Sequence, residues 1–252
     1  MSTNLQGKVV VVTGASGGMG FETSKMLAAR GAKVSMSDIQ EKPLFDAAKK
    51  IEAAGGQVMA QVVDVRDRSS VEDWISKTVK KFGKINGAAN LAGVLPRTYN
   101  THTIEDQPDD EWDRVIAINL TGVMYCMRAE LEHMTDGGSI VNASSIAGIV
   151  GTPTNIPYGA SKFGVVGLTK CAALEVGPTR SIRVNCIAPG TIKTPMYDQV
   201  REARNGKPID EIQAIKRDGR PDEIASLICW LLCDESSYIT GQVQNICGGY
   251  VC

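Results

Sequence analysis

The 252-residue sequence contains few histidines, no C-x-x-C pair and no long apolar run. Two histidines, His102 and His133, are too few for a histidine-based metal site and disfavour a Ser-His-Asp triad. We therefore expect no bound metal. The seven cysteines are odd in number and scattered, which is typical of reduced thiols in a cytoplasmic protein.

Segments that would direct the chain to a membrane are also missing. No apolar run approaches the ~18 residues that a spanning helix needs. The first residues lack the basic and apolar regions of a signal peptide. The net charge of −1 and the scattered basic residues provide no surface field for nucleic acid or anionic lipid. We expect a globular protein with no nucleic-acid or membrane partner.

Strand-like and helix-like segments alternate throughout the sequence. Such alternation predicts a parallel sheet with helices on both faces, here a single-domain α/β Rossmann-like doubly wound sheet of about seven strands. No linker or repeat divides residues 1–252. Strands are expected at 8–13, 32–37, 57–63, 85–90, 138–144, 181–188 and 242–247. Helices are expected at 21–30, 43–54, 69–82, 111–134 and 158–176, and from 221 onward. Ligands bind such sheets at the carboxyl ends of the strands.

A glycine-rich loop follows the first expected strand and precedes a helix. Its pattern, Thr13-Gly14-x3-Gly18-x-Gly20, lets the backbone approach a pyrophosphate at the helix N-terminus. Asp38 ends the second strand, where a carboxylate can accept hydrogen bonds from both adenosine ribose hydroxyls and repel a 2′-phosphate. No Lys or Arg lies in the loop at 15–17 or next to Asp38. The pattern therefore favours NAD over NADP.

Tyr158 and Lys162 lie four residues apart in an expected helix and so share one face. A tyrosine hydroxyl titrates near ~10, and a nearby ammonium favours the phenolate. Lowering the pKa to neutrality would take roughly 3 units, or about 4 kcal/mol. The pair alone is also compatible with an ordinary helix turn, so the other motifs decide its meaning.

Together these motifs resemble the short-chain dehydrogenase/reductase family over almost the whole chain. Besides the glycine loop and the Tyr158–Lys162 pair, the matching elements are Asp64-Val65, Asn90-Leu91-Ala92-Gly93, Asn119, Ser145 and Pro189-Gly190-x-Ile192-x-Thr194. Leu91 replaces an asparagine of the family pattern, which leaves Asn90 and Gly93 for cofactor contacts. Cys247 stands where the family often has aspartate, a change that we expect to lie far from the chemistry.

The resemblance implies a role for each site residue. Tyr158 would act as general acid or base, and Lys162 would lower its pKa and hold the nicotinamide ribose. Ser145 would hydrogen-bond the substrate oxygen, and Ser144 is the less favoured serine. Asn119 would hold a water that links Lys162 to solvent, the alternative being a residue that marks a helix kink. The implied cofactor-binding residues are Gly14, Ser16, Gly18, Met19, Gly20, Asp38, Ile39, Asp64, Val65, Asn90, Ala92, Gly93, Tyr158, Lys162, Pro189, Gly190, Ile192 and Thr194.

The substrate region is expected at 94–99, 146–157 and in a lid over 193–219. These segments are mostly apolar near the site, which favours a secondary alcohol or ketone on an apolar small molecule. The resemblance further implies a homotetramer or dimer joined through the long helices and the C-terminal tail. Two alternatives remain: an epimerase or dehydratase of the same fold, and a regulatory protein that binds NAD without turnover. Binding alone would not need Ser145, Tyr158 and Lys162, which disfavours the second alternative.

Overall fold

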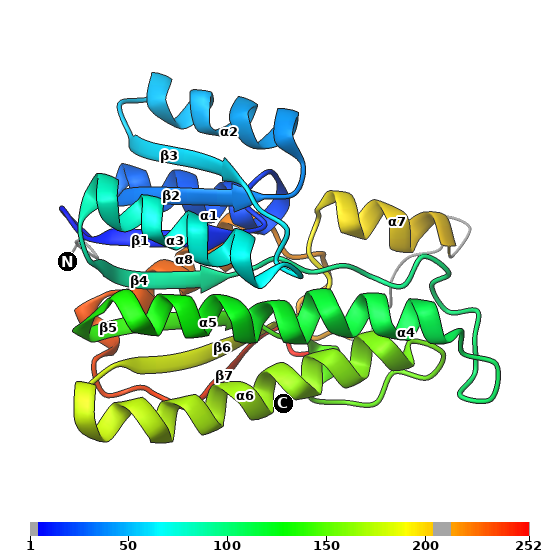
Figure 1. Ribbon diagram of the computed structural model, residues 1–252. Coiled ribbons are helices and arrows are strands. Elements are labelled where there is room, and N and C mark those ends of the chain that lie inside the picture. The colour runs from blue at the N-terminus through cyan, green and yellow to red at the C-terminus, as the bar shows by residue number, and fades with distance from the viewer. Residues whose placement is uncertain (1–4, 204–212, 252) are drawn as a thin grey trace.

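The computed structural model describes residues 5–203 and 213–251, and its centre is one parallel sheet (Figure 1). The strand order is β3-β2-β1-β4-β5-β6-β7, and every neighbouring pair is parallel. The strands are β1 (Val9–Thr13), β2 (Lys33–Asp38), β3 (Gln57–Val62), β4 (Ile85–Asn90), β5 (Met134–Ala143), β6 (Arg183–Pro189) and β7 (Val243–Ile246). The expected fold class and all seven expected strands are confirmed.

Strand β1 has the composition of a segment that is covered on both faces. Strand β1 is Val-Val-Val-Val-Thr and is buried throughout, because β-branched side chains pack well on both sides of a pleated strand. At the carboxyl end of the sheet, Thr13 of β1 pairs with Asn90 of β4, and Asn90 pairs with Asn142 of β5. Three polar side chains from three strands therefore lie in one row where the central strands end.

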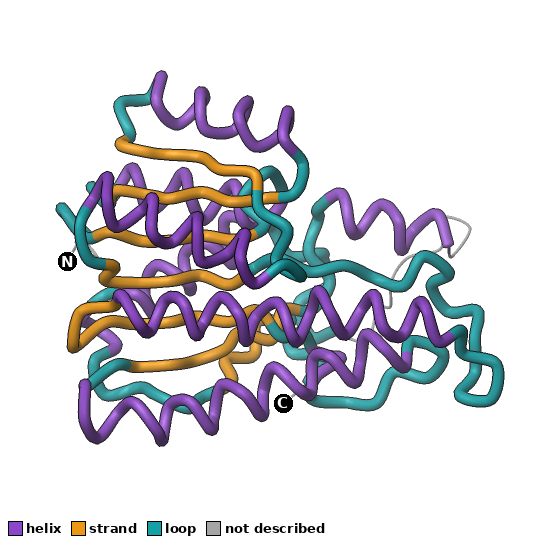
Figure 2. Tube along the Cα trace, in the orientation of Figure 1, coloured by secondary structure: helices purple, strands orange, loops and turns teal. Residues whose placement is uncertain are grey.

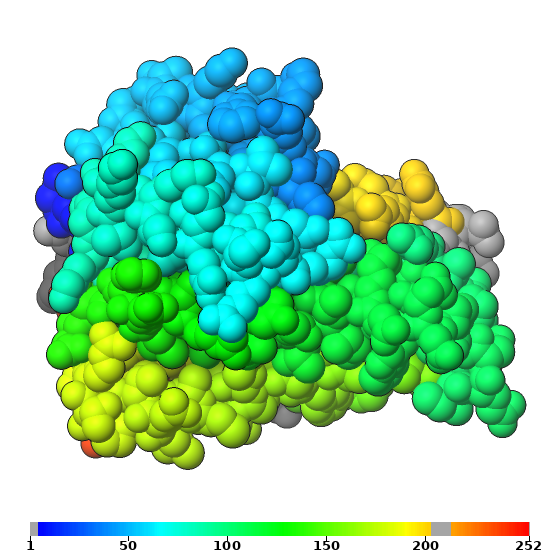
Figure 3. Space-filling view, viewed as in Figure 1, coloured from blue at the N-terminus to red at the C-terminus, as the bar shows by residue number. Residues whose placement is uncertain are grey.

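Two helical layers cover the sheet, and each encloses its own apolar core. Helices α1 (Gly18–Ala29), α2 (Glu41–Ala53) and α8 (Pro221–Leu232) pack on one face. Helices α3 (Arg68–Phe82), α5 (Gly122–His133) and α6 (Ile156–Arg180) pack on the other. Figure 3 shows the second layer from outside, with the side chains of α3, α5 and α6 hiding the sheet. Within the described ranges, no helix is both long and apolar enough to cross a membrane.

Several helix boundaries differ from expectation, and two of the differences have a physical reason. The helix expected at 111–134 is α4 (Asp109–Ile116), a π-helical turn (Ala117–Thr121) and α5, and it ends before Met134 because β5 already begins there. Helix α6 does not stop at Gly177-Pro178 but continues to Arg180. The Arg180 guanidinium donates to the carbonyl oxygens of Leu131 and Met134, which anchors the last turn.

Candidate active site

The candidate site lies at the carboxyl ends of the strands, next to the point where the chain order of the sheet reverses. From β1 the chain passes to β2 on one side, whereas β4 lies on the other side, and sheets of this kind bind ligands at such a switch point. Long loops gather at this end of the tube in Figure 2. Helix α7 (Pro195–Ala203) and the segment that leads into α4 extend beyond it.

The glycine loop is built for close backbone approach. Gly14 and Gly18 have φ angles of +66° and +53°, a region in which residues with a side chain are strained. A methyl group on Gly20 would lie 2.0 Å from the Gly14 carbonyl oxygen. The Thr13 hydroxyl accepts hydrogen bonds from the backbone N–H groups of Leu91 (3.0 Å) and Ala92 (3.1 Å). The loops after β1 and β4 are therefore locked together.

The first turn of α1 is available to an anion. Its N-cap is Gly17, and no described side chain caps the free N–H groups of that turn. A helix N-terminus with unsatisfied donors stabilises a phosphate through hydrogen bonds and through the helix dipole. These residues fit the pyrophosphate of a dinucleotide.

Two carboxylates follow the neighbouring strands β2 and β3. Asp38 accepts hydrogen bonds from the backbone N–H groups of Ser16 (3.1 Å) and Gln40 (3.0 Å), so its side chain faces the glycine loop. Asp64 binds the Arg66 guanidinium at 2.6 Å, and this partner lowers the pKa of the Asp64 carboxyl. The Arg66 charge is thus already paired.

The structure brings Ser145, Tyr158 and Lys162 together where β5 meets α6. Ser145 follows β5 and accepts from the Ala147 N–H at 3.2 Å, and its hydrogen bond to Tyr158 lowers the pKa of that phenol. Lys162 is buried, and its Nζ donates to the Ala143 carbonyl at 2.9 Å and lies 5.5 Å from the centre of the Tyr158 ring. Ser144 instead binds the Lys162 carbonyl oxygen at 2.9 Å, which is a structural role.

The acid–base properties of this pair differ from the sequence expectation. Desolvation raises the pKa of Tyr158 to about 12. The hydrogen bond with Ser145 lowers this pKa but offsets only part of the rise. Desolvation also lowers the pKa of Lys162 to about 8. The expected lowering of the tyrosine pKa by the lysine is absent here, and the Lys162 ammonium is directed at a backbone carbonyl instead. A group bound between them would change this balance.

Asn119 lies in the π-helical turn between α4 and α5 and is fully buried. Its side-chain oxygen accepts from the Val94 N–H (2.8 Å), and its amide donates to the Val94 carbonyl (2.9 Å) and to Ser161 (3.2 Å). The side chain therefore clamps the chain just after Gly93. A methyl group on Gly93 would lie 3.3 Å from the Asn119 oxygen and 3.4 Å from Lys162 Nζ. All three residues border one narrow space.

The segment after β6 closes over the glycine loop. A methyl group on Gly18 would lie 3.2 Å from the Thr194 side chain, so the predicted cofactor residues on the two loops face each other. A methyl group on Gly190 would lie 2.8 Å from the Cα of Cys247. Cys247 thus packs directly behind the Pro189-Gly190 turn, next to residues that are expected to bind the cofactor.

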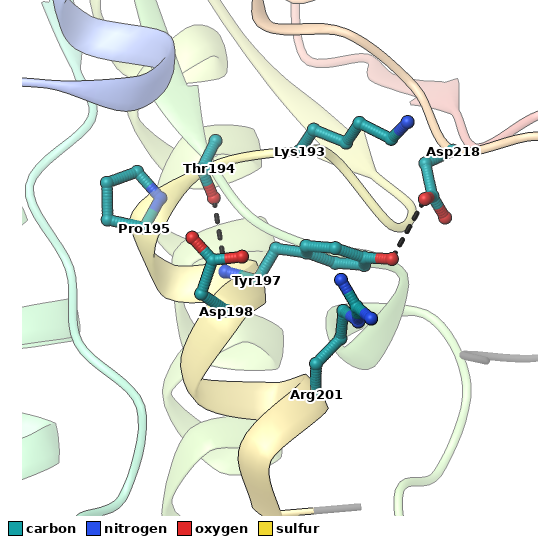
Figure 4. Close-up of a pocket in the computed structure, with 7 residues that line it drawn as sticks. All are labelled: Lys193, Thr194, Pro195, Tyr197, Asp198, Arg201 and Asp218. Atoms are coloured by element: carbon teal, nitrogen blue, oxygen red, sulfur yellow. Dashed lines mark hydrogen bonds between the residues drawn. The ribbon is translucent and has the colours of Figure 1, made fainter. Parts of the chain in front are cut away.

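The expected lid at 193–219 begins and ends at one point. Ile192 and Gly219 form an isolated parallel bridge, reinforced by the hydrogen bond from the Lys193 N–H to the Gly219 carbonyl (3.0 Å). Part of this lid, 204–212, lies outside the described residues. A cavity of about 710 Å³ lies beside α7 (Figure 4). Its lining residues are Lys193, Thr194, Pro195, Tyr197, Asp198, Arg201 and Asp218.

Some contacts that shape this site were not predicted, although Tyr99 and Tyr197 lie within the expected substrate region. Thr13 was noticed only as part of the glycine motif, although its hydroxyl joins two loops. The Tyr197 hydroxyl donates to Asp218 at 2.9 Å across the base of the lid. The Tyr99 phenol is close enough to Tyr158 to raise its pKa electrostatically. No sequence spacing indicates these contacts, because each joins separate segments through the fold.

Comparisons with known proteins agree with this geometry. A family model described as enoyl-(acyl carrier protein) reductase matches residues 14–251. The short-chain dehydrogenase/reductase aba4 of Botryotinia fuckeliana is 44% identical, over 97% of each chain. Cyclohexanol dehydrogenase of an Acinetobacter species is 36% identical, over 99% of this chain and 97% of that one. A solved structure of levodione reductase is 35% identical, covers 97% of each chain and superposes with a TM-score of 0.92.

A doubly wound sheet with a glycine loop at its switch point defines a Rossmann-type dinucleotide-binding fold, and the matching family implies a nicotinamide cofactor. The family model and the relatives cover nearly the whole chain. The chain belongs to the short-chain dehydrogenase/reductase family, whose enzymes act on CH–OH groups of small molecules.

Proposed function

We propose that the protein is an NAD-dependent oxidoreductase that interconverts a secondary alcohol and a ketone on a mostly apolar small molecule. The observation that carries this proposal is the convergence of Ser145, Tyr158 and Lys162 beside Gly93, at the carboxyl ends of the central strands. The bound cofactor supplies or accepts the hydride, and the protein must orient the substrate and move one proton.

Each of these side chains has a defined task in the proposal. In ketone reduction, the Tyr158 hydroxyl donates its proton to the substrate oxygen, and in alcohol oxidation the phenolate takes that proton. Ser145 donates a hydrogen bond to the same oxygen, where negative charge develops. The Lys162 ammonium stabilises the phenolate once the site is filled, and its proximity to Gly93 supports a role in binding the nicotinamide ribose.

Asn119 contributes chiefly by holding the backbone. Because its amide is bonded to both backbone groups of Val94, it keeps Gly93 and Val94 at the wall of the site. The π-helical turn around Asn119 frees backbone groups from the regular helical pattern. A water that links Lys162 to solvent would therefore be held by the backbone at this turn rather than by the Asn119 amide.

The preference for NAD rests on Asp38 and on the pairing of nearby charges. Asp38 faces the glycine loop as an acceptor, which suits ribose hydroxyls and repels a 2′-phosphate. The Arg66 guanidinium could attract a 2′-phosphate, but it is already bound to the Asp64 carboxylate at 2.6 Å. Asp64, Val65 and the exposed Ile39 would border the adenosine.

A cyclic secondary alcohol is the substrate class that we favour. Cyclohexanol dehydrogenase and levodione reductase are similar over nearly the whole chain. The Ile146, Ile149 and Pro157 side chains come from segments that flank Ser145 and Tyr158, and they offer apolar walls. The charged residues near α7 lie in the proposed lid, over 193–219, at the cavity of about 710 Å³.

We further propose a homo-oligomer, a tetramer or a dimer, in the cytoplasm. Helix α6 carries the exposed apolar side chains Phe163 and Leu174, and Leu174 is 78% exposed in the single chain. Burying such side chains against a second copy would stabilise an assembly. The described cysteines are free, as expected in a reducing compartment. Light-scattering mass would distinguish a monomer from a dimer and a tetramer.

Turnover tests the proposed reaction. A panel of cyclic and open-chain secondary alcohols and ketones is offered with NAD⁺ or NADH, and absorbance of NADH is followed. The Tyr158→Phe variant should lose about 10²–10⁴-fold in kcat, because the proton donor is gone. The exposed, distant Tyr238→Phe serves as the matched control.

The alternatives predict different results. An epimerase or dehydratase would convert its substrate without net change in NADH. A regulatory protein would bind NAD with no turnover of any substrate in the panel. Unchanged turnover in the Tyr158→Phe variant would refute the assigned acid–base role.

A further inference from the structure

A carboxyl group is buried directly behind the turn at 91–93, which we call the cofactor turn. Glu130 on α5 is 0% exposed, and Asn90, Asn142 and Thr169 around it are equally inaccessible. Asn90 Nδ2 donates to Glu130 Oε2 (3.1 Å) and to Asn142 Oδ1 (3.0 Å). Asn142 in turn donates to the Thr169 hydroxyl at 3.0 Å. One polar chain therefore connects α5, β4, β5 and α6.

Two atoms of this chain are unsatisfied. Among the described residues, neither Glu130 Oε1 nor Asn90 Oδ1 has a hydrogen-bond partner. Both are acceptors when the carboxyl group is ionised, and a buried acceptor without a donor costs about 1–3 kcal/mol. The other two side-chain atoms of this pair, Asn90 Nδ2 and Glu130 Oε2, already share a hydrogen bond at 3.1 Å. One proton on the carboxyl group would give Asn90 Oδ1 a donor and leave no ionised carboxylate in the interior.

We propose that Glu130 is held as a neutral carboxylic acid that hydrogen-bonds the Asn90 amide through both its oxygens and thereby positions the cofactor turn at 91–93. It is a positioning residue, because it acts through Asn90 and touches neither cofactor nor substrate. The proton comes from solvent and returns to solvent, so no other reactant is needed.

The charges around Glu130 agree with this assignment. Burial raises its pKa to about 8, and the Asn90 hydrogen bond opposes this only in part. No charged group contributes to the shift. The strands β4 and β5 and helix α6 present Asn90, Asn142 and Thr169. Its own helix adds the Cys126 thiol, and α3 packs there with apolar side chains such as Trp74.

The connection to the site runs through strand ends. Asn90 is the last residue of β4, directly before Leu91, Ala92 and Gly93. Asn142 directly precedes Ala143, whose carbonyl accepts the Lys162 hydrogen bond at 2.9 Å. Ionisation of Glu130 removes its donor to Asn90 and places a negative charge behind both contacts. The turn that borders the cofactor site is then less firmly held.

The test uses an isosteric substitution that cannot titrate. Glu130→Gln keeps one acceptor and one donor for the Asn90 amide, whereas Glu130→Leu keeps neither. Glu132→Gln, an exposed position on the same helix, is the matched control. Thermal unfolding of the full-length protein is measured from pH 5 to 9.5.

The sign of the expected effect follows from the raised pKa. Between 4.5 and about 8, the unfolded protein has released this proton and the folded protein has kept it. Stability must therefore fall as pH rises through that window, and level off above it. As pH rises through this window, we expect the Tm of the wild type and of Glu132→Gln to fall relative to that of Glu130→Gln. The difference in slope should correspond to one proton bound by the folded state. Parallel curves for all three proteins would overturn the proposal.

Two further measurements test the proposal without recording unfolding. The infrared spectrum of the wild type near pH 6.5 should contain the carbonyl band of a protonated, buried carboxylic acid, and this band should vanish as pH passes 8. Its absence near pH 6.5 would refute the neutral acid.

The positioning role is tested by NAD binding measured calorimetrically at pH 6.5 and 9. Wild-type affinity should weaken several-fold more than that of Glu130→Gln, and Glu130→Leu should be weak at both values. Identical pH profiles would refute the link to the turn. The unfolding and infrared measurements involve no cofactor, so they test the protonation state of Glu130 independently of NAD binding. Failure of the protein to bind NAD would count against the proposed function instead.

Discussion

Replacing Asp38 by alanine should change which dinucleotide the protein prefers. The Asp38 carboxylate accepts the Ser16 and Gln40 N–H groups at 3.1 and 3.0 Å and so lies beside the glycine loop. At roughly 5 Å, two unit charges repel by about 0.8 kcal/mol in water and about 3 kcal/mol at an effective dielectric constant of 20. Asp38 is half-buried, so about 2 kcal/mol is a reasonable value for a 2′-phosphate. Removing this repulsion should tighten NADP⁺ binding about 30-fold.

The same substitution removes the acceptor that the adenosine ribose of NAD⁺ would use. Losing charge-assisted hydrogen bonds at a partly exposed position costs about 2 kcal/mol, or roughly another 30-fold. The ratio of the two dissociation constants should therefore change by about three orders of magnitude. Calorimetric titration with NAD⁺ and NADP⁺ measures it without any substrate. Asp136→Asn, at the opposite end of the sheet, makes the same change in net charge and should leave the ratio unchanged. A change below about fivefold in a folded Asp38→Ala protein would refute the reasoning.

Three further substitutions test separate parts of the structure. Ser145→Ala should lower kcat about 10²–10³-fold, while the NAD⁺ dissociation constant measured by titration stays constant, because the lost hydrogen bond goes to the reacting oxygen. Lys162→Met should alter the pH dependence of unfolding: the folded pKa is lowered to about 8 from 10.5, so the unfolded wild type binds more protons in that window. Wild-type stability should therefore rise with pH from 8 to 10.5 relative to the variant. Ser35→Ala should cost about 1–3 kcal/mol in denaturant unfolding, because the buried Trp74 Nε1 loses its acceptor at 2.8 Å. Ser237→Ala on the surface should cost almost nothing.

Much of the fold could be predicted because its determinants are local. The β-branched runs of the strands and the glycines after them indicate both the sheet and its carboxyl edge, and strand β1 illustrates this. The Tyr158–Lys162 pair was predicted from its spacing and Ser145 from the family resemblance, and the structure brings all three together. Their catalytic roles remain a proposal.

What could not be predicted depends on contacts between distant segments. Helix α6 continues past Pro178 because Arg180 binds carbonyl groups of Leu131 and Met134. Glu130 lies between charged neighbours on a helix, and nothing in that pattern indicates that it is fully buried. The pKa of Tyr158 was expected to fall, but it rises because desolvation outweighs its neighbours. Whether a single polar side chain such as Glu130 is buried depends on the assembled fold, and its neighbours in the sequence do not indicate it.

The bridge between Ile192 and Gly219 affects how the sequence of this protein can change in evolution. Because Ile192 and Gly219 meet at one point, the length and composition of the segment between them can vary while the sheet and the Ser145, Tyr158 and Lys162 side chains keep their positions. Doubling such a loop costs only about 0.6 kcal/mol in closure entropy. New substrate ranges could therefore arise by exchange of the part of this segment beyond Thr194, by recombination or by design, while Ser145, Tyr158 and Lys162 stay unchanged.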